Sequence, residues 1–394
     1  MAFDLNKIIS LPSICIAIGA LAVAVPAASA EPEATSQVDD DQMSSEQPAS
    51  PIPDLRNEDL KLKAQGKKDR DFLIVPIPMS SPTFGTGLIL GGAYYYPQTA
   101  EQKEAQPASF TGGAIAYTDN KSWAGGVMQQ NYFAEDTWRF NAVAAYADFK
   151  LELVAPDEET GESLLDWLVK GAILQTSLDR RIAGNWFLGA SLRYLDIQQD
   201  LDLNTGLPDF NPDEAIKSPG LGLKLEYDSR DVPSNPYRGQ RLEVKTIFAD
   251  QKNMQNGSYQ SYYARFRSYH LLSDPLVLAW EVNACLKEGR IPLWDTCRLT
   301  LRGFPITRYL SLQSIQAQAE VRWNFHKRWG MVAFAGAGRV KDSLDNHGED
   351  ETIPSYGIGL RWMVLKSQRI NVRVDYARSN NGQSAWYLSV AEAF

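Results

Sequence analysis

The chain has 394 residues, of which 22% are charged and 44% hydrophobic, and its formal net charge is -9. An acidic chain without a basic stripe is unsuited to nucleic acid, so we predict no nucleic-acid partner. His270, His326 and His347 lie far apart with no metal-ligand or catalytic spacing, so we predict no metal, no cofactor and no enzymatic activity.

The N-terminus has the pattern of an export signal. Lys7 precedes an apolar run, residues 8–25, that ends in Ala28-Ser29-Ala30. This pattern predicts a signal peptide over residues 1–30, cleaved after Ala30. A membrane anchor is the alternative, but two prolines interrupt the run and small residues end it, which favours the signal.

Residues 31–70 differ in composition from both neighbours. They are acidic and rich in Ser, Pro and Gln, with few bulky apolar side chains. Such a segment buries too little apolar surface to fold by itself, so we predict a disordered acidic linker.

From residue 71 to residue 394 the chain shows period-2 alternation. In the stretch 221–228 Leu221, Leu223, Leu225 and Tyr227 share one face, and Lys224, Glu226 and Asp228 share the other. The pattern recurs at 242–248, 276–283 and 370–376. A soluble sandwich would turn the apolar face inward, whereas a membrane barrel would turn it toward lipid and leave the charges in the lumen.

Three features favour the barrel. The alternating segments are longer than the strands of soluble sheets and match a tilted crossing of a bilayer. Aromatic residues stand near segment ends, as in an interfacial girdle: Tyr94–Tyr96, Tyr132, Phe133, Trp138, Trp186, Tyr262, Tyr263, Trp323, Trp362 and Trp386. The last segment ends on Phe394, which resembles the C-terminal assembly signal of outer-membrane barrels, although Glu392 interrupts its apolar face.

The sequence predicts sixteen antiparallel strands, an even number as a single-chain barrel requires. Short turns at 133–135, 182–184, 272–274, 326–328 and 366–367 fall on one end of this barrel, together with the longer turn 230–238. Long connections at 150–167, 199–217, 288–311 and 339–353 fall on the other end. The expected strands are 71–79, 85–97, 108–118, 122–132, 136–149, 168–181, 185–198, 218–229, 239–250, 258–271, 275–287, 312–325, 329–338, 354–365, 368–378 and 384–393.

The longest connection, 288–311, contains Arg302-Gly303-Phe304. The loop could remain outside with Arg302 solvated, or it could fold into the lumen. An arginine inside needs a carboxylate, because an unpaired buried charge costs several kcal/mol. Glu320 on the next strand is the candidate partner, and the residues alone leave both readings open.

Two cysteines, Cys285 and Cys297, remain after removal of the signal. An even pair in an exported chain makes a disulfide possible. Two unpaired thiols are the equal alternative.

At this point the motifs resemble those of the BamA/TamA outer-membrane barrel superfamily, also called the bacterial surface antigen family. Arg302-Gly303-Phe304 resembles its sixth-loop motif, and Ala319-Glu320-Val321-Arg322 resembles the strand that follows. Residues 228–239, with Asp228, Arg230, Asp231, Pro236 and Gly239, are similar to its periplasmic turn, and 332–338 to another of its strands.

The resemblance implies a barrel of sixteen strands over residues 71–394, with the sixth external loop in the lumen and Arg302 paired to inner-wall acids. Glu320 matches one acidic position. The second falls on Gly336, so we expect that contact to be lost. Only about 40 residues separate the signal from the first strand, which implies a barrel-only member without polypeptide-transport-associated domains.

The resemblance also implies a location and a function. We expect a protein of the Gram-negative outer membrane that aids insertion or export of outer-membrane components through a weak seam between its first and last strands. Its expected partners are outer-membrane lipids and barrel-assembly machinery or a periplasmic protein. The alternative is a passive pore or a structural surface antigen.

Overall fold

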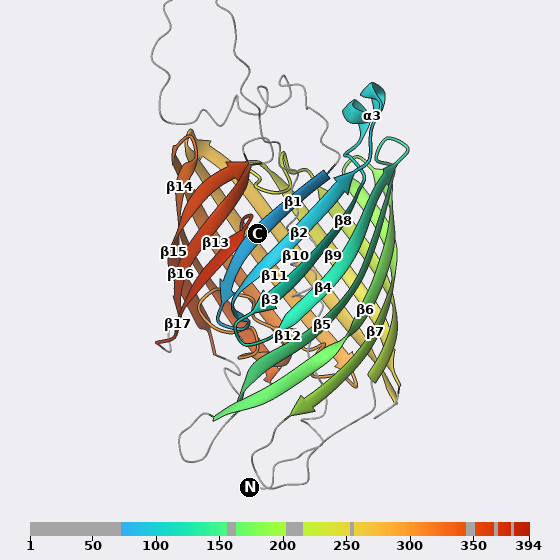
Figure 1. Ribbon diagram of the computed structural model, residues 1–394, viewed down its shortest axis with the longest axis vertical. Coiled ribbons are helices and arrows are strands. Elements are labelled where there is room, and N and C mark those ends of the chain that lie inside the picture. Colours follow the sequence, from blue (N-terminus) through green and yellow to red (C-terminus); the bar gives the residue numbers. More distant parts are fainter. Residues whose placement is uncertain are drawn as a thin grey trace, which may run out of the picture.

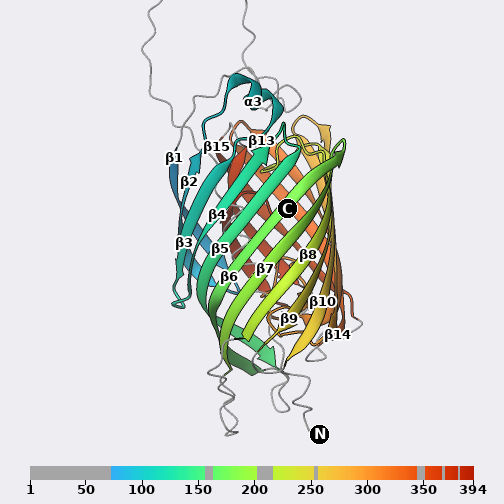
Figure 2. The same ribbon diagram turned by 90° about the vertical axis from the view of Figure 1, so that its right-hand side faces the viewer.

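The computed structural model describes residues 72–155, 163–201, 216–252, 256–343, 351–365, 369–379 and 382–394. The predicted signal 1–30 and linker 31–70 lie outside these ranges. The described strands form one closed antiparallel barrel (Figures 1 and 2). Within the described part of the chain, no helix is both long enough and apolar enough to cross a bilayer.

One sheet contains 17 strands among the described residues, and one of them, β12, has two residues and belongs to a loop. The other sixteen build the wall, which confirms the predicted strand number and barrel class. Their bounds are β1 Phe72–Ser81, β2 Gly85–Tyr95, β3 Phe110–Thr118, β4 Trp123–Phe133, β5 Trp138–Ala155, β6 Ser163–Ala183, β7 Trp186–Leu201, β8 Ile216–Asp228, β9 Gly239–Gln251, β10 Gly257–Ser273, β11 Leu276–Gly289, β13 Leu310–His326, β14 Trp329–Ser343, β15 Ile353–Leu365, β16 Ile370–Ser379 and β17 Ser384–Val390.

Two connections differ from the prediction. Of the predicted connection 150–167, residues 150–155 and 163–167 belong to strands, because β5 and β6 stay paired out to Ala155 and Ser163. The β2–β3 connection contains a short helix, α3 (Ala100–Ala105), with Thr99 and Gln102 in a reciprocal capping box. The sequence Thr-x-x-Gln carries this signal, which the strand pattern on both sides conceals.

The two faces of the wall have opposite character. Leu221, Leu223 and Val374 are 62%, 57% and 38% exposed, whereas the neighbouring Glu226 and Asp375 are 5% and 0% exposed. Large apolar side chains therefore face outward and charged ones inward, as a lipid-facing wall requires. Exposed tryptophans lie near strand ends, and the rings of Trp329 and Trp362 stack with centroids 6.2 Å apart.

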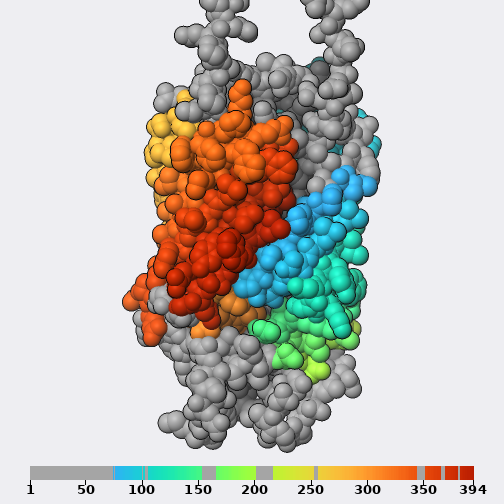
Figure 3. Space-filling view, turned by 60° about the vertical axis from the view of Figure 1, so that its left-hand side comes forward, coloured from blue at the N-terminus to red at the C-terminus, as the bar shows by residue number. Residues whose placement is uncertain are grey.

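The closure of the barrel is its thinnest ladder. β1 pairs with β2 over ten consecutive residue pairs, but with β17 through the single pair Ser80↔Leu388. Figure 3 shows these N-terminal and C-terminal strands, blue and red, side by side on one face. We call this β1–β17 contact the seam.

The prediction that Phe394 continues an outward apolar face is wrong. β17 ends at Val390, and Ala391 takes a positive φ of 69° that turns the chain. Phe394 is then buried with Tyr269 and Ala279, which lie on the inner face. A left-handed residue breaks strand geometry, so the last residues leave the ladder and enter the barrel.

The orientation of the faces predicts the effect of a charge on the outer wall. Leu223→Arg places a guanidinium in hydrocarbon and should reduce the free energy of unfolding by about 2–4 kcal/mol. Urea titration of the chain folded into lipid vesicles measures this. Glu135→Arg, at an exposed turn position between β4 and β5, is the matched control and should change little. An equal effect of both variants would show that Leu223 does not face lipid.

Candidate functional site

The connection between β11 and β13, residues 290–309, folds back on its own base. We call it the long loop. Cys285 of β11 and Cys297 of the loop form a disulfide, with Cα atoms 5.7 Å apart. Next to it β12, Cys297–Arg298, pairs with Leu310 and Ser311 of β13. The loop is thus tied to both strands that it connects.

The first charged anchor of the long loop is Asp295. Its carboxylate accepts hydrogen bonds from Arg193 of β7 at 2.8 Å and Tyr259 of β10 at 2.8 Å, and lies 2.6 Å from Lys287 Nζ of β11. Asp295 is 1% exposed. Burial opposes its charge, but the Arg193 and Lys287 cations outweigh it and hold the pKa of Asp295 well below its ordinary value.

The second anchor is Arg302, and it carries the opposite charge. One guanidinium nitrogen lies 2.9 Å from Glu320 of β13 and another 2.9 Å from Asp375 of β16. The guanidinium carbon also stands 3.4 Å from the centroid of the Phe334 ring of β14. Both carboxylates are fully buried, so the two negative charges compensate a cation held away from water.

The acidic contact at position 336 is absent, as expected, but Arg302 nevertheless has a second carboxylate. Gly336 offers no carboxylate, but Asp375 on a different strand supplies one. Gly336 instead makes room for the loop. A Cβ atom there would stand 3.0 Å from a methyl of Leu301 and 2.7 Å from the carbonyl of Ala317, which is closer than side chains pack.

Arg302 is the centre of a chain of ion pairs. Glu320 also binds Arg322 at 2.7 Å, and Asp375 binds Arg361 at 2.5 Å. Arg361 in turn lies 2.8 Å from Glu392, beyond the end of β17. Burial disfavours the Glu392 carboxylate, but the Arg361 and Arg322 cations prevail and lower its pKa to about 2. Positive and negative side chains alternate along this series of ion pairs, so each ion lies next to one of opposite charge.

The β8–β9 turn, residues 229–238, contacts this network through Arg322. Asp228 and Arg230 pair at 2.7 Å. Asp231 accepts the backbone N–H of Tyr237 at 3.0 Å and lies 2.7 Å from Arg369. Gly239 ends the turn at φ +99°, where a Cβ would collide with the carbonyl of Ser229.

Arg322 connects the turn with the C-terminus. Besides Glu320, it donates to the Pro236 carbonyl at 3.3 Å and to the main-chain oxygen of Phe394 at 3.0 Å. A single inner-wall guanidinium thus contacts the loop's acidic partner, the β8–β9 turn and the chain end. Removing it would leave all three with unpaired acceptors.

The tip of the long loop reaches both sides of the seam. The Gly303 amide donates to the Tyr387 hydroxyl of β17 at 2.8 Å. The Ile306 amide donates to the Thr83 hydroxyl, in the turn between β1 and β2, at 3.0 Å. Two backbone donors of one loop therefore bridge the strands that pair with each other only at Ser80↔Leu388.

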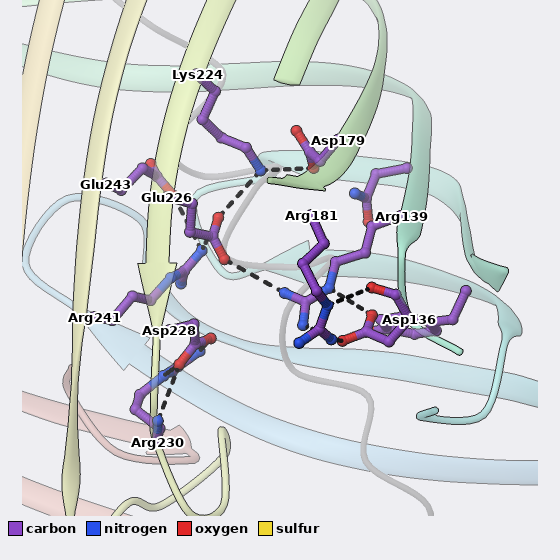
Figure 4. A network of polar contacts seen from close by, with 12 residues as sticks. Asp136, Arg139, Asp179, Arg181, Lys224, Glu226, Asp228, Arg230, Arg241 and Glu243 are labelled. Atoms are coloured by element: carbon purple, nitrogen blue, oxygen red, sulfur yellow. Dashed lines mark hydrogen bonds and ion pairs between the residues drawn. The ribbon is translucent and has the colours of Figure 1, made fainter. Parts of the chain in front are cut away.

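The opposite wall carries a second ionic network (Figure 4). Glu226 lies 3.1 Å from Lys224, 3.3 Å from Arg241 and 3.7 Å from Arg139. The remaining members extend it to neighbouring strands and turns: Asp136, Asp179, Arg181 and Glu243. No described group of His, Cys, Asp or Glu is arranged to hold a metal ion, and the pairing of acids with bases is suited to a polar inner wall.

The sequence reasoning missed several residues of these contacts: Arg193, Asp295, Arg369, Asp375 and Tyr387. Asp375 belongs to the charged face of an alternating strand, so the sequence pattern predicts that its side chain points inward. The sequence does not predict its partner, because the tilt and stagger of the strands determine which strand lies beside a given loop residue. Asp295 had one indirect signal, its place in the loop closed by Cys285 and Cys297.

The Arg302 geometry predicts a large effect of truncation. Arg302→Ala removes one cation from both Glu320 and Asp375, which keep Arg322 and Arg361 as partners, and it should cost about 1–3 kcal/mol of folding free energy. It should also open residues 290–309 to protease. Arg302→Lys keeps the positive charge but lacks the planar guanidinium that reaches two carboxylates at once, so its loss of folding free energy should be intermediate. Arg339→Ala, at an exposed residue of β14, is the control, and equal protease resistance of it and Arg302→Ala would refute the anchor.

The lowered pKa of Glu392 predicts a pH dependence. Its unfolded pKa is about 4.3, so its stabilisation is complete above that pH and is lost as the pH falls through about 2. Glu392→Gln lacks this titration and should show a shallower loss of stability between these pH values. Urea midpoints measured across the range test it, and parallel curves for the two proteins would contradict the Arg361–Glu392 pair.

Comparisons with known proteins agree with this geometry. Residues 169–394 match the model of the Omp85 superfamily domain. None of the curated protein sequences is similar enough to match. Among solved structures, BamA from Haemophilus ducreyi lacking POTRA domains 1–3 has a TM-score of 0.54 at 13% identity, with 82% of this chain and 71% of that chain covered.

Two CdiB structures are also similar. The one from Escherichia coli has a TM-score of 0.58 at 11% identity, covering 83% of this chain and 64% of that one. The one from Acinetobacter baumannii has a TM-score of 0.54 at 12% identity, covering 82% and 60%. The chain thus spans less than two thirds of either CdiB chain, and at these identities the likeness concerns the fold.

Proposed function

Because the chain belongs to the Omp85 superfamily and is a barrel of the Gram-negative outer membrane, we propose that it aids the insertion or export of outer-membrane components through its seam. The observation that carries the proposal is the seam itself. Every other pair of neighbouring wall strands in the described structure shares a continuous ladder of seven or more residue pairs, whereas β1 and β17 share one.

An open strand edge is a template for another strand. Exposed N–H and C=O groups pair with an extended chain, and the added strand then lies in the sheet with one face toward lipid. A wall that separates at the seam would offer such edges to a client within the membrane. Here the tip of the long loop holds the seam from inside, through Gly303 with Tyr387 and Ile306 with Thr83.

The partners proposed for this role are lipids and a protein on the periplasmic side. Lipid contacts the exposed apolar face around residues such as Leu221 and Trp386. Barrel-assembly machinery or another periplasmic protein would deliver the client to the barrel. The β8–β9 turn, with Asp228, Arg230 and Asp231, is the part of the periplasmic end that the resemblance marks.

A passive pore, or a structural surface antigen, is the second candidate. The charged inner wall of Figure 4 favours a wetted interior. The long loop argues against conduction, because its buried residues include Trp294, Leu299 and Phe304. These apolar side chains occupy space that ions and solutes would need.

Depletion of the protein separates the two candidates. If it assembles or exports proteins, the amounts of other folded outer-membrane barrels should fall severalfold on depletion, and the wild-type gene should restore them. Quantitative proteomics of outer-membrane fractions measures this. Normal amounts of all other barrels, together with slower uptake of small solutes, would reject the assembly function and support the pore.

A further inference from the structure

The direction in which the N–H and C=O groups of β1 point determines which hydrogen-bond donors and acceptors this strand presents at the seam. Thr86 of β2 points both its N–H and its C=O at Asp119, on the β3 side, with the carbonyl bond at 2.8 Å and the side-chain bond at 3.1 Å. Ser80 lies opposite Thr86 in the β1–β2 ladder. Because a residue in an antiparallel ladder points both groups to one side, Ser80 points its own groups away from β2, at the seam.

This direction alternates along the strand, so residues of the same parity as Ser80 also face the seam. They include Pro76 and Pro78 within β1, and Pro82 just beyond its end continues the series. A proline has no N–H to donate. From residue 76 to residue 82, Ser80 alone among these positions has a donor, and it is the residue that pairs with β17.

The edge of β17 that faces the seam contains no proline and so lacks no N–H donor. The Ala391 amide donates to Asn371 of the β16 side at 2.8 Å. Residues of the opposite parity therefore face the seam, and these are Trp386, Leu388 and Val390. All three carry an N–H and a C=O.

The register places these residues against the prolines. Ser80 is paired with Leu388, so continuing the antiparallel ladder one step each way sets Pro78 opposite Val390 and Pro82 opposite Trp386. Both flanking positions lack the donor on the β1 side. The prolines thus confine the seam to a single backbone pair.

We propose that β17, and not β1, is the edge on which a client strand pairs when the seam opens, with the β1–β2 hairpin displaced. This rests on the proposed function and specifies its docking surface. The occupant is an extended amphipathic strand of a client barrel. It pairs with Trp386, Leu388 and Val390, and its apolar side chains lie beside the 63% exposed Trp386, facing lipid. β1 lacks two of the donors that such a strand needs.

Photo-crosslinking to a defined strand tests the edge. The full chain in lipid vesicles carries a photo-crosslinking amino acid at Leu388 in one variant and at Ile74, a seam-facing residue of β1, in the other. The probe is a synthetic peptide of alternating leucine and threonine with a terminal phenylalanine, about ten residues long, the length of a membrane strand. Two missing hydrogen bonds predict at least about tenfold more capture at Leu388.

Two further variants make the test specific. Pro76→Val with Pro78→Val restores the donors and should raise capture at Ile74 about tenfold. Ser80→Cys with Leu388→Cys locks the seam by a disulfide in a protein that carries the crosslinker at Val390 instead, and should abolish capture there. Unchanged heat-modifiability on gels verifies that each variant is folded.

Each outcome is decisive. Equal or greater capture at Ile74 in the wild-type chain overturns the assignment of the edge and leaves the proposed function standing. Failure of the valine variant to change the ratio also overturns it, since the prolines would then not be the cause. Capture that persists with the seam locked places the peptide elsewhere and overturns it too. Absence of capture at both positions rejects strand addition at the seam, and with it the proposed function.

Discussion

The requirement that every charge inside the barrel has an opposite partner governs the long loop. Asp295 is an acid of the loop held between Arg193 and Lys287 of the wall. Arg302 is a base of the loop held between two acids of the wall. The two anchors have opposite polarity, so a slipped or reversed loop would bring like charges together in a low-dielectric interior, where the penalty is large.

These anchors join strands that are distant along the chain. The first connects β7, β10 and β11, and the second connects β13 and β16. The disulfide fixes the base of the loop, so its tip has little freedom and arrives at Tyr387 and Thr83. A loop pinned by ion pairs to β7, β10 and β11 at one end, and to β16 beside the seam at the other, can therefore hold shut a seam whose own strands share one pair. Loosening the loop and opening the seam become linked events.

The sequence was sufficient for the wall and for part of the site. Period-2 alternation with charged inner faces predicted sixteen strands, and most of their ends were correct within a few residues. Glu320 was predictable as a partner of Arg302 because it follows the loop directly on an inward position. Asp375 was not, because its strand β16 is separated from β13 by β14 and β15 in the wall, and stagger, not sequence distance, determines which residue reaches Arg302. Phe394 was misplaced because one left-handed residue, Ala391, ends the alternation without any change in its pattern.

Hydrogen exchange at the loop tip tests the central claim most directly. The amides of Gly303 and Ile306 are hydrogen-bonded to Tyr387 and Thr83 behind a buried arginine. If the charged anchors hold the loop against the inner wall, these two amides should exchange as slowly as those of the neighbouring strand β13, because their exchange then requires opening of the barrel. Exchange within seconds at both amides, in a barrel whose strands stay protected, would show that the loop is free and that the anchors do not hold it.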